Sequence, residues 1–211
     1  MIKFIMCTVV YLASVPFKAH TEKIPVISKE NPELYSTLCF LIKSSEGYSD
    51  EVYRCSAGVK TRGWGITKVE IVELNKKLGT NYKWSDLNNI ESNNKIIRDC
   101  IQYRYDKIIK EYPYLDKPTA YGLVSFTYNL GLGALKSKSI RRGLNHLKNT
   151  GDKSMLISAM NKYVYIKNKK SKGLIKRRTL ETKLISNELS KVDSETLRQQ
   201  VILQIINNRN N

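Results

Sequence analysis

One short segment, residues 46–61, contains the residue types that acid–base chemistry on a sugar requires. The string EGYSDEVYRCSAGVKT holds three acids, a cysteine and a threonine: Glu46, Asp50, Glu51, Cys55 and Thr61. A carboxyl group in apolar surroundings resists ionisation and can therefore serve as a general acid. Cleavage of a glycosidic bond needs such an acid, and a second group that activates water or attacks the sugar. The residue types leave Asp50, Glu51 and Cys55 open as that second group. The plainer interpretation is that all three acids are solvated charges.

The flanking sequence predicts how these residues are held. Residues 34–45 place apolar side chains at three- and four-residue steps, which predicts a helix ending at Glu46 with Gly47 as its cap. Residues 51–68 combine glycines, aromatic residues and short alternations, which is typical of a small antiparallel sheet. Beyond residue 68 the pattern predicts six or seven helices, and residues 153–166 form one of them. The expected fold class is α+β, mostly α.

The charge of the chain points to an anionic partner. Its 36 Lys and Arg residues against 19 Asp and Glu give a net charge of +17. Such an excess favours a nucleic acid, an anionic membrane or an acidic cell-wall polymer, unless the lysines are simply solvated. The sequence contains no helix-turn-helix, zinc-finger or RNA-binding motif, so nucleic acid is not the expected partner. A basic nucleic-acid-binding protein remains the alternative from another functional class.

The cysteines and histidines argue against a metal site. The four cysteines, at positions 7, 39, 55 and 100, form no CxxC pair, and the chain has only two histidines, His20 and His146. No metal or cofactor is therefore expected. Cys100 lies on an apolar helical stripe and is expected to be buried, whereas His146 is expected at a helix surface or core edge. Four cysteines allow three complete pairings, and the sequence does not choose among them.

The N-terminus has the character of an export segment. Residues 4–17 form a mainly apolar run after a lysine, which is too short for a spanning helix of ~20 residues but suits a signal-peptide core of ~7–15. No clean cleavage site follows, so an uncleaved anchor is the second interpretation and a buried first helix the third. The expected location is the periplasm or the extracellular space, with transient retention in the inner membrane if the segment stays attached.

The spacing of the candidate residues resembles a known catalytic pattern. Glu46, Cys55 and Thr61 are separated by eight and then five residues, which resembles the pattern of the phage-type lysozymes, glycoside hydrolase family 24, where the middle residue is Asp or Cys. Residues 53–67, YRCSAGVKTRGWGIT, resemble the family's hairpin motif. Ile66 stands where the family often has histidine, which puts a hydrogen bond near the sheet in doubt.

Two distant segments extend this resemblance. LVSFTYNLGLGAL, residues 123–135, is similar to the family's Leu-x-Ser-Phe-x-Phe/Tyr-Asn-x-Gly segment, which lines the lobe across the cleft. GLIKRRTLETKL, residues 173–184, is similar to its Gly-Leu-x-x-Arg-Arg-x-x-Glu helix. The resemblance covers residues 34–189 and implies a lysozyme-like fold, with a small sheet lobe, a helical lobe and the active site in the cleft between them.

The resemblance also implies a function. It implies an endolysin-type muramidase that hydrolyses the β-1,4 bond between N-acetylmuramic acid and N-acetylglucosamine in bacterial peptidoglycan, and so lyses cells. Glu46 would be the general acid, Cys55 would handle the water or stabilise the oxocarbenium ion, and Thr61 would hold that water. Asp50 and Glu51 then become surface charges. A monomer that binds peptidoglycan and anionic wall or membrane surfaces is expected. The alternative is a wall-binding protein with weakened catalysis.

A cysteine at this position changes the expected chemistry. A thiol has a reference pKa of ~8.5, far above that of aspartate, so activity should rise over a higher pH range. Arg54, Lys60 and Arg62 would favour the thiolate if they face it. Water activation would invert the anomeric centre, whereas attack by the thiolate would retain it. Cys7 and Cys39 resemble the arrangement of family members with uncleaved anchor segments, which suggests a redox switch acting on Cys55, although Tyr48 stands where a blocking cysteine would be. The alternative is that Cys7 is part of the signal core and Cys39 is packed.

These observations divide the chain into four parts. Residues 1–22 are the signal or signal-anchor segment, and residues 23–33, with two prolines, are a linker. Residues 34–189 are the lysozyme catalytic domain. Residues 190–211 are a helical tail beyond the family resemblance, with an Asn- and Gln-rich composition.

Overall fold

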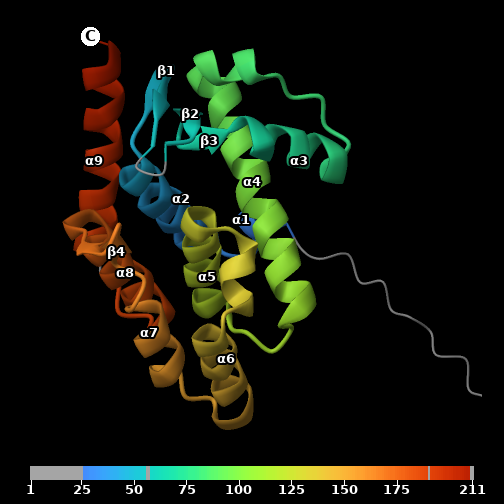
Figure 1. Cartoon of the computed structure of the whole chain (residues 1–211), viewed down its shortest axis with the longest axis vertical. Helices are drawn as coiled ribbons and strands as arrows, with labels where there is room; N and C mark the ends of the chain where they lie inside the picture. The colour runs from blue at the N-terminus through green and yellow to red at the C-terminus, as the bar shows by residue number, and fades with distance from the viewer. Residues whose placement is uncertain (1–25, 56–57, 190, 210–211) are drawn as a thin grey trace, which may run out of the picture.

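The computed structural model describes residues 26–55, 58–189 and 191–209 (Figure 1). The predicted export segment, residues 1–22, lies outside these residues together with Cys7 and His20. Within the described residues, no helix combines the length and the apolar character needed to cross a membrane.

The described chain is mostly helical and contains two small antiparallel sheets, which confirms the predicted α+β class. Its α-helices and strands are α1 (Ile27–Glu30), α2 (Pro32–Glu46), β1 (Ser49–Arg54), β2 (Lys60–Gly63), β3 (Ile66–Thr67), α3 (Lys68–Leu78), α4 (Ile90–Glu111), α5 (Lys117–Leu130), α6 (Lys138–Thr150), α7 (Ser154–Met160), β4 (Tyr165–Ile166), β5 (Lys169–Lys170), α8 (Lys172–Ile185) and α9 (Lys191–Arg209). Two 3-10 helices, η1 (Trp84–Asn88) and η2 (Leu132–Lys136), precede α4 and α6. Figure 1 shows the sheet of β1–β3 with α3 at one end of the long α4, and the helices α5–α8 towards the other end.

Helix α2 ends where the sequence predicts. Its first turn is capped by the side chain of Asn31, which accepts a hydrogen bond from the Leu34 amide at 3.1 Å. Leu38, Leu41 and Ile42 are fully buried on its inner face. The helix stops after Glu46 because Gly47 has φ 75°, a conformation that favours glycine.

The sheet hairpin is attached to the helices by one tryptophan. Strands β1, β2 and β3 pair antiparallel in chain order, with Thr61 opposite both Tyr53 and Thr67. Trp64, between β2 and β3, is fully buried, and its indole N–H donates to Asn94 Oδ1 of α4 at 3.1 Å. The Lys43 ammonium of α2 lies 5.2 Å from the centre of the Trp64 ring. These contacts fix the hairpin against α2 and α4.

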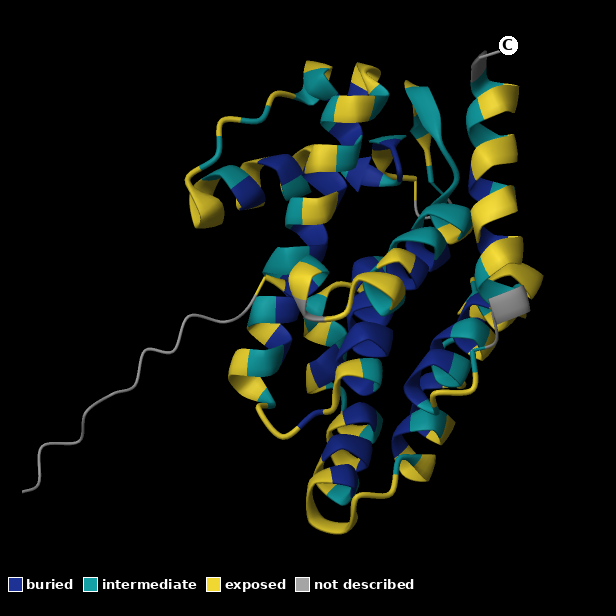
Figure 2. Ribbon diagram, turned by 180° about the vertical axis from the view of Figure 1, so that it is seen from behind, coloured by how far each residue is buried: buried dark blue, intermediate teal, exposed yellow. Residues whose placement is uncertain are grey.

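The core lies between α4, α5 and the helices around them (Figure 2). The predicted apolar stripe of α4 is confirmed, since its members are buried: Ile97, Cys100, Ile101, Tyr105 and Ile108. Helix α5 is buried along most of its length and packs against α2, α4 and α8. An aspartate side chain, Asp116, caps its start by accepting from the Thr119 amide at 3.1 Å.

The prediction of one continuous helix over residues 153–166 is wrong. Helix α7 stops at Met160, and the chain then forms the hairpin β4–β5. Its two-residue turn has positive φ at Lys167 (46°) and Asn168 (64°), as primed hairpin turns require. The apolar residues after Met160 have helical spacing but pack against the core from the loop. The centre of the Tyr163 ring, for example, lies 5.2 Å from the centre of the Phe126 ring.

The segment expected as a linker, residues 23–33, contains structure. Helix α1 occupies four of its residues, and Ile27 is 1% exposed. The Ile27 amide donates to Gln102 Oε1 at 3.0 Å, and the Tyr121 hydroxyl donates to the Ile27 carbonyl at 3.1 Å. A single buried isoleucine with its backbone satisfied is too short a pattern to stand out in the sequence.

The C-terminal tail forms a 19-residue helix, α9, that packs along α2 (Figure 1). Leu197 and Val201 are buried in this contact. The tail is thus part of the folded structure rather than an appendage.

Candidate active site

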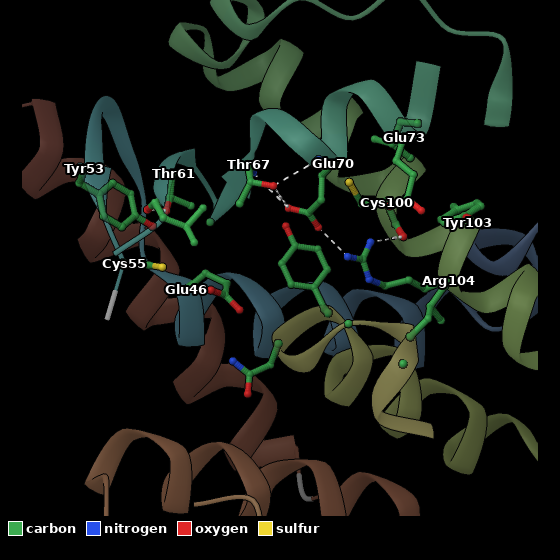
Figure 3. A pocket seen from close by; sticks show the side chains of 18 residues that line it. Glu46, Tyr53, Cys55, Thr61, Thr67, Glu70, Glu73, Cys100, Tyr103 and Arg104 are labelled. Atoms are coloured by element: carbon green, nitrogen blue, oxygen red, sulfur yellow. Dashed lines mark hydrogen bonds and ion pairs between the residues drawn. The ribbon is translucent and has the colours of Figure 1, made fainter. Parts of the chain in front are cut away.

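The predicted site residues line one cavity. Its volume is about 600 Å³, and Glu46, Cys55 and Thr61 all form its wall (Figure 3). The remaining lining residues come from the hairpin and from α3, α4, the end of α5 and η2: Tyr53, Val59, Gly65, Thr67, Glu70, Glu73, Leu74, Cys100, Tyr103, Arg104, Tyr128, Asn129, Gly131, Leu132 and Gly133. Asp50 and Glu51 belong to β1 but are not among the described residues that line it.

Glu46 is held from behind by a buried arginine. One nitrogen of Arg177 donates to Glu46 Oε1, another donates to the Ser125 carbonyl at 3.0 Å, and a third donates to Glu181 Oε1 at 3.0 Å. Burial disfavours the charged guanidinium, but the two carboxylates raise the pKa of Arg177 above its ordinary value. Arg177 therefore stays charged and fixes the Glu46 carboxylate at the end of α2.

A second arginine completes the same network. Arg178 donates to Glu181 Oε2 and to Asn129 Oδ1, and its guanidinium lies 4.7 Å from the Phe126 ring. The Ser125 hydroxyl donates to Glu181 Oε1 at 2.7 Å. The two distant segments noted in the sequence, 123–135 and 173–184, thus meet directly behind Glu46.

The sequence indicates part of this network, although the spacing of its residues does not by itself assign them a function. Arg177 and Arg178 lie four and three residues before Glu181, spacings at which side chains on one helix can pair. The pairing of Arg177 with Glu46, 131 residues away, depends on the tertiary fold. Arg177 is the main site residue that the sequence reasoning did not assign.

Gly65 brings the hairpin against the other carboxylate oxygen. Its φ is 80°, and a Cβ added there would lie 2.7 Å from Glu46 Oε2. Any larger residue would push the carboxylate away or move the hairpin. Because Arg177 binds Oε1, Oε2 is the oxygen on the hairpin side of the cavity.

Cys55 and Thr61 are set by the hairpin loop. The Cys55 amide donates to the Val59 carbonyl at 3.0 Å, which closes the loop after β1. Thr61 is 3% exposed, and its hydroxyl donates to the same carbonyl at 2.8 Å. A hydroxyl whose single proton is used in this way can still accept a hydrogen bond from water.

Tyr53 is a further cavity residue, part of the hairpin motif but without an assigned role. Burial, followed by the negative charges of Glu46 and Cys55, raises the pKa of Tyr53 to about 12. The phenol therefore remains protonated and can donate a hydrogen bond to a sugar oxygen.

The three basic residues that could favour a thiolate at Cys55 do not line the cavity. Arg54 donates to the Gly58 carbonyl at 2.7 Å, and Arg62 donates to the Asp50 carbonyl. Lys60 is exposed, and the described lining of the cavity includes none of these three cations.

The opposite wall contains an ion pair. Glu70 accepts from Arg104 at 2.5 Å through Oε1 and from the Thr67 amide at 3.1 Å through Oε2. Thr67 and Glu70 form a capping box at the start of α3. Ile66, in the position where the resembling family often has histidine, is fully buried in the core. Glu70 and Arg104 link the start of α3 to α4.

Of the other cysteines and the histidine that the structure describes, Cys100 lines the cavity, whereas Cys39 and His146 do not. Cys100 is buried, as predicted, and lines the cavity on α4, whereas Cys39 is half-buried on α2 and burial raises its pKa. Cys39, Cys55 and Cys100 carry thiols in the structure. The proposed redox switch stays a prediction because Cys7 lies outside the described residues. His146 contacts Asp152 at the helix surface, and the described residues contain no His, Cys, Asp and Glu cluster suited to a metal.

The fold, a small antiparallel sheet beside a helical lobe with a cavity between them, is that of the lysozyme-type glycosidases. The family profile described as phage lysozyme matches residues 43–181, which is more than half of the 211 residues. The chain therefore belongs to the phage lysozyme family. A comparison with curated protein sequences gives no significant match.

Solved structures share this fold. The active form of the P1 phage endolysin Lyz is similar over 79% of this chain and 92% of its own, with 19% identity and a TM-score of 0.55. The endolysin from Escherichia coli O157:H7 phage FAHEc1 covers 71% of this chain and 90% of its own, with 26% identity and a TM-score of 0.52. The muramidase domain of SpmX from Asticaccaulis excentricus covers 71% of this chain and 94% of its own, with 21% identity and a TM-score of 0.52.

The buried network makes a prediction about stability. Replacing Glu181 with Gln leaves two buried arginines without their shared carboxylate, and this should reduce the free energy of unfolding by about 3–5 kcal/mol. Thermal unfolding should show a Tm lower by roughly 10 °C. The matched control is Glu195→Gln on α9, because Glu195 and its partner Arg198 are 53% and 57% exposed, and such pairs contribute less than ~1 kcal/mol. Equal Tm values for the two variants would contradict the network's role.

Proposed function

We propose that this protein is an endolysin-type muramidase that hydrolyses the β-1,4 bond between N-acetylmuramic acid and N-acetylglucosamine in bacterial peptidoglycan. The observation that carries the proposal is the cavity in which Glu46, fixed by Arg177, shares a wall with Cys55 and Thr61. Membership of the phage lysozyme family supports it, as do neighbours described as endolysins and a muramidase domain.

Glu46 is the general acid in this proposal. Arg177 occupies Oε1, so Oε2 carries the proton that passes to the oxygen of the departing N-acetylglucosamine. The C1–O4 bond breaks as that proton arrives, and the muramic acid ring takes on oxocarbenium character. Arg177 holds the carboxylate in one orientation through this step, which reduces the entropy that the reaction must otherwise lose.

Cys55 and Thr61 act on the attacking water. Thr61 Oγ1 donates its proton to the Val59 carbonyl, so it accepts one hydrogen of the water, while the Cys55 thiolate accepts the other. The water's lone pair is then directed at C1. As the new C1–O bond forms, Cys55 takes the water's proton and becomes a thiol. Proton exchange with solvent restores the thiolate and the protonated Glu46.

The positive charge of the chain supports peptidoglycan and its associated anionic polymers as the partner. Peptidoglycan and its associated polymers are anionic, and a net charge of +17 attracts such surfaces over a distance set by ionic strength. We propose that these surfaces bind the protein as a monomer and that nucleic acid is not a partner.

Replacement of the acid should abolish lysis. Glu46→Gln keeps the shape of the side chain but carries no transferable carboxyl proton, so the rate of cell-wall clearing should fall by about 10²–10⁴-fold. Turbidity of a purified peptidoglycan suspension measures this rate. Glu51→Gln is the control, because Glu51 is an exposed acid of the same segment. Clearing that survives in Glu46→Gln would point to disruption of the wall or membrane by charge instead.

The pH profile should identify the role of Cys55. A base must be deprotonated to act, and a thiol has a reference pKa of ~8.5 against ~3.9 for aspartate. Wild-type activity should therefore rise between about pH 6 and 9, and Cys55→Asp should lose this rise. Cys39→Ser, outside the cavity, should keep the wild-type profile. Matching profiles for wild type and Cys55→Asp would rule out the thiolate as the base.

The product anomer should separate water activation from attack by sulfur. Direct attack of the activated water on C1 inverts the configuration, so the first-formed reducing end should be the α-anomer. Proton NMR during early hydrolysis of a soluble peptidoglycan fragment records the anomer before mutarotation. A β-anomer as first product would replace the proposal with a covalent thioglycoside intermediate on Cys55.

A further inference from the structure

Helix α9 lies beyond the part of the chain that matches the phage lysozyme family, residues 43–181, yet it contacts both helices that carry the ion pair at the acid. We infer that α9 is a positioning element for Glu46: it fixes the end of α2 relative to α8, and Gln204 is its principal contact. This inference rests on the proposed role of Glu46 as the acid.

The first contact is made at the end of α2. The last four carbonyls of a helix have no partner inside it. In α2 the Gly47 amide donates to the Lys43 carbonyl at 3.0 Å, and Gln204 Nε2 of α9 donates to the Ser44 carbonyl at 3.2 Å. Ser44 lies two residues before Glu46. An α9 side chain therefore supplies a hydrogen-bond donor to the turn that carries the acid.

The second contact is made with α8. Lys176, next to Arg177 in the chain, donates to Gln200 Oε1 at 3.3 Å, and Lys183 forms an ion pair with Asp193 at 3.2 Å. Gln200 also lines a second cavity of about 300 Å³, whose wall includes Glu46 and Arg177. Helix α9 thus shares a cavity wall with both members of the ion pair.

An apolar face keeps α9 in place. Leu197 and Val201 are 2% and 4% exposed, and the Thr37 and Ser194 hydroxyls of α2 and α9 lie 3.2 Å apart. Figures 1 and 2 both show α9 running beside α2 and on past its end along the sheet lobe. Because these contacts are spread along the helix, the loss of one hydrogen bond at Gln204 leaves α9 docked.

A substitution at Gln204 can distinguish an effect on the position of Glu46 from an effect on the stability of the fold. Its Oε1 is buried and has no hydrogen-bond partner in the described part of the chain, while its Nε2 serves Ser44. Methionine is similar in length and removes the donor together with this unsatisfied acceptor. Loss of the bond to the Ser44 carbonyl lowers the free energy of unfolding, whereas loss of the unsatisfied Oε1 raises it, so the two changes oppose each other. A change in activity would then report on the geometry of Glu46.

The test compares Gln204→Met with Gln199→Met in the full-length protein. Gln199 lies on the same helix, is exposed and bonds only to Glu195 within α9 among the described contacts. On soluble peptidoglycan fragments, Gln204→Met should lower kcat on the order of tenfold with KM unchanged, and Gln204→Lys, which restores a donor, should recover part of it. Gln199→Met should match wild type, and the Tm of all variants should stay close to that of wild type.

Hydrogen exchange gives a readout that does not depend on catalysis. The Gly47 amide should exchange faster in Gln204→Met than in Gln199→Met, because the last turn of α2 opens more readily. If wild type releases no reducing ends, the proposed function fails, and this exchange comparison still tests α9. Equal kcat in the two variants, equal exchange at Gly47, or a loss of kcat that follows a loss of Tm would each overturn the inference.

Discussion

The structure around the site depends on one buried cation. Arg177 is 3% exposed, and a guanidinium so far from water is tolerated only when charges and hydrogen bonds compensate it. Glu46 from α2, Glu181 from α8 and the Ser125 carbonyl from α5 supply that compensation. Three helices are therefore bound to one another through a single side chain, and the acid is one of the groups that complete it.

This arrangement explains which parts of the site the sequence could predict. The end of α2 follows from local rules, namely apolar spacing and a glycine with positive φ, so Glu46 could be placed at a helix end. Cys55 and Thr61 could be proposed only through the resemblance of the hairpin to the phage-type lysozyme motif, and the structure places them on the wall of one cavity with Glu46. Arg177 could not be assigned, because a charged residue in a helix is usually solvated and only the fold shows that this one is buried.

The wrong prediction of one helix over residues 153–166 and the unforeseen turn at Ile27 have the same physical origin. Residues 163 and 164 are apolar at helical spacing, but the turn at Lys167 and Asn168 reverses the chain, and neither residue is a glycine that would mark it. Ile27 needs Gln102 and Tyr121, 75 and 94 residues away, to satisfy its backbone groups. Local sequence patterns carry no information about such partners, so a buried single turn looks like a linker.

Glu46 is positioned by the helices and Cys55 by the hairpin. These two parts of the molecule meet at the adjacent residues Trp64 and Gly65. The buried arginine network fixes Glu46 from the helical side, whereas the backbone of the hairpin loop fixes Cys55 from the other side. Trp64 attaches the hairpin to α2 and α4, and Gly65 lets it approach the Glu46 carboxylate without a side chain between them. The separation of Glu46 and Cys55 is therefore set by packing at Trp64 and Gly65, so under the proposed function a substitution at either position changes the rate although both Glu46 and Cys55 are retained.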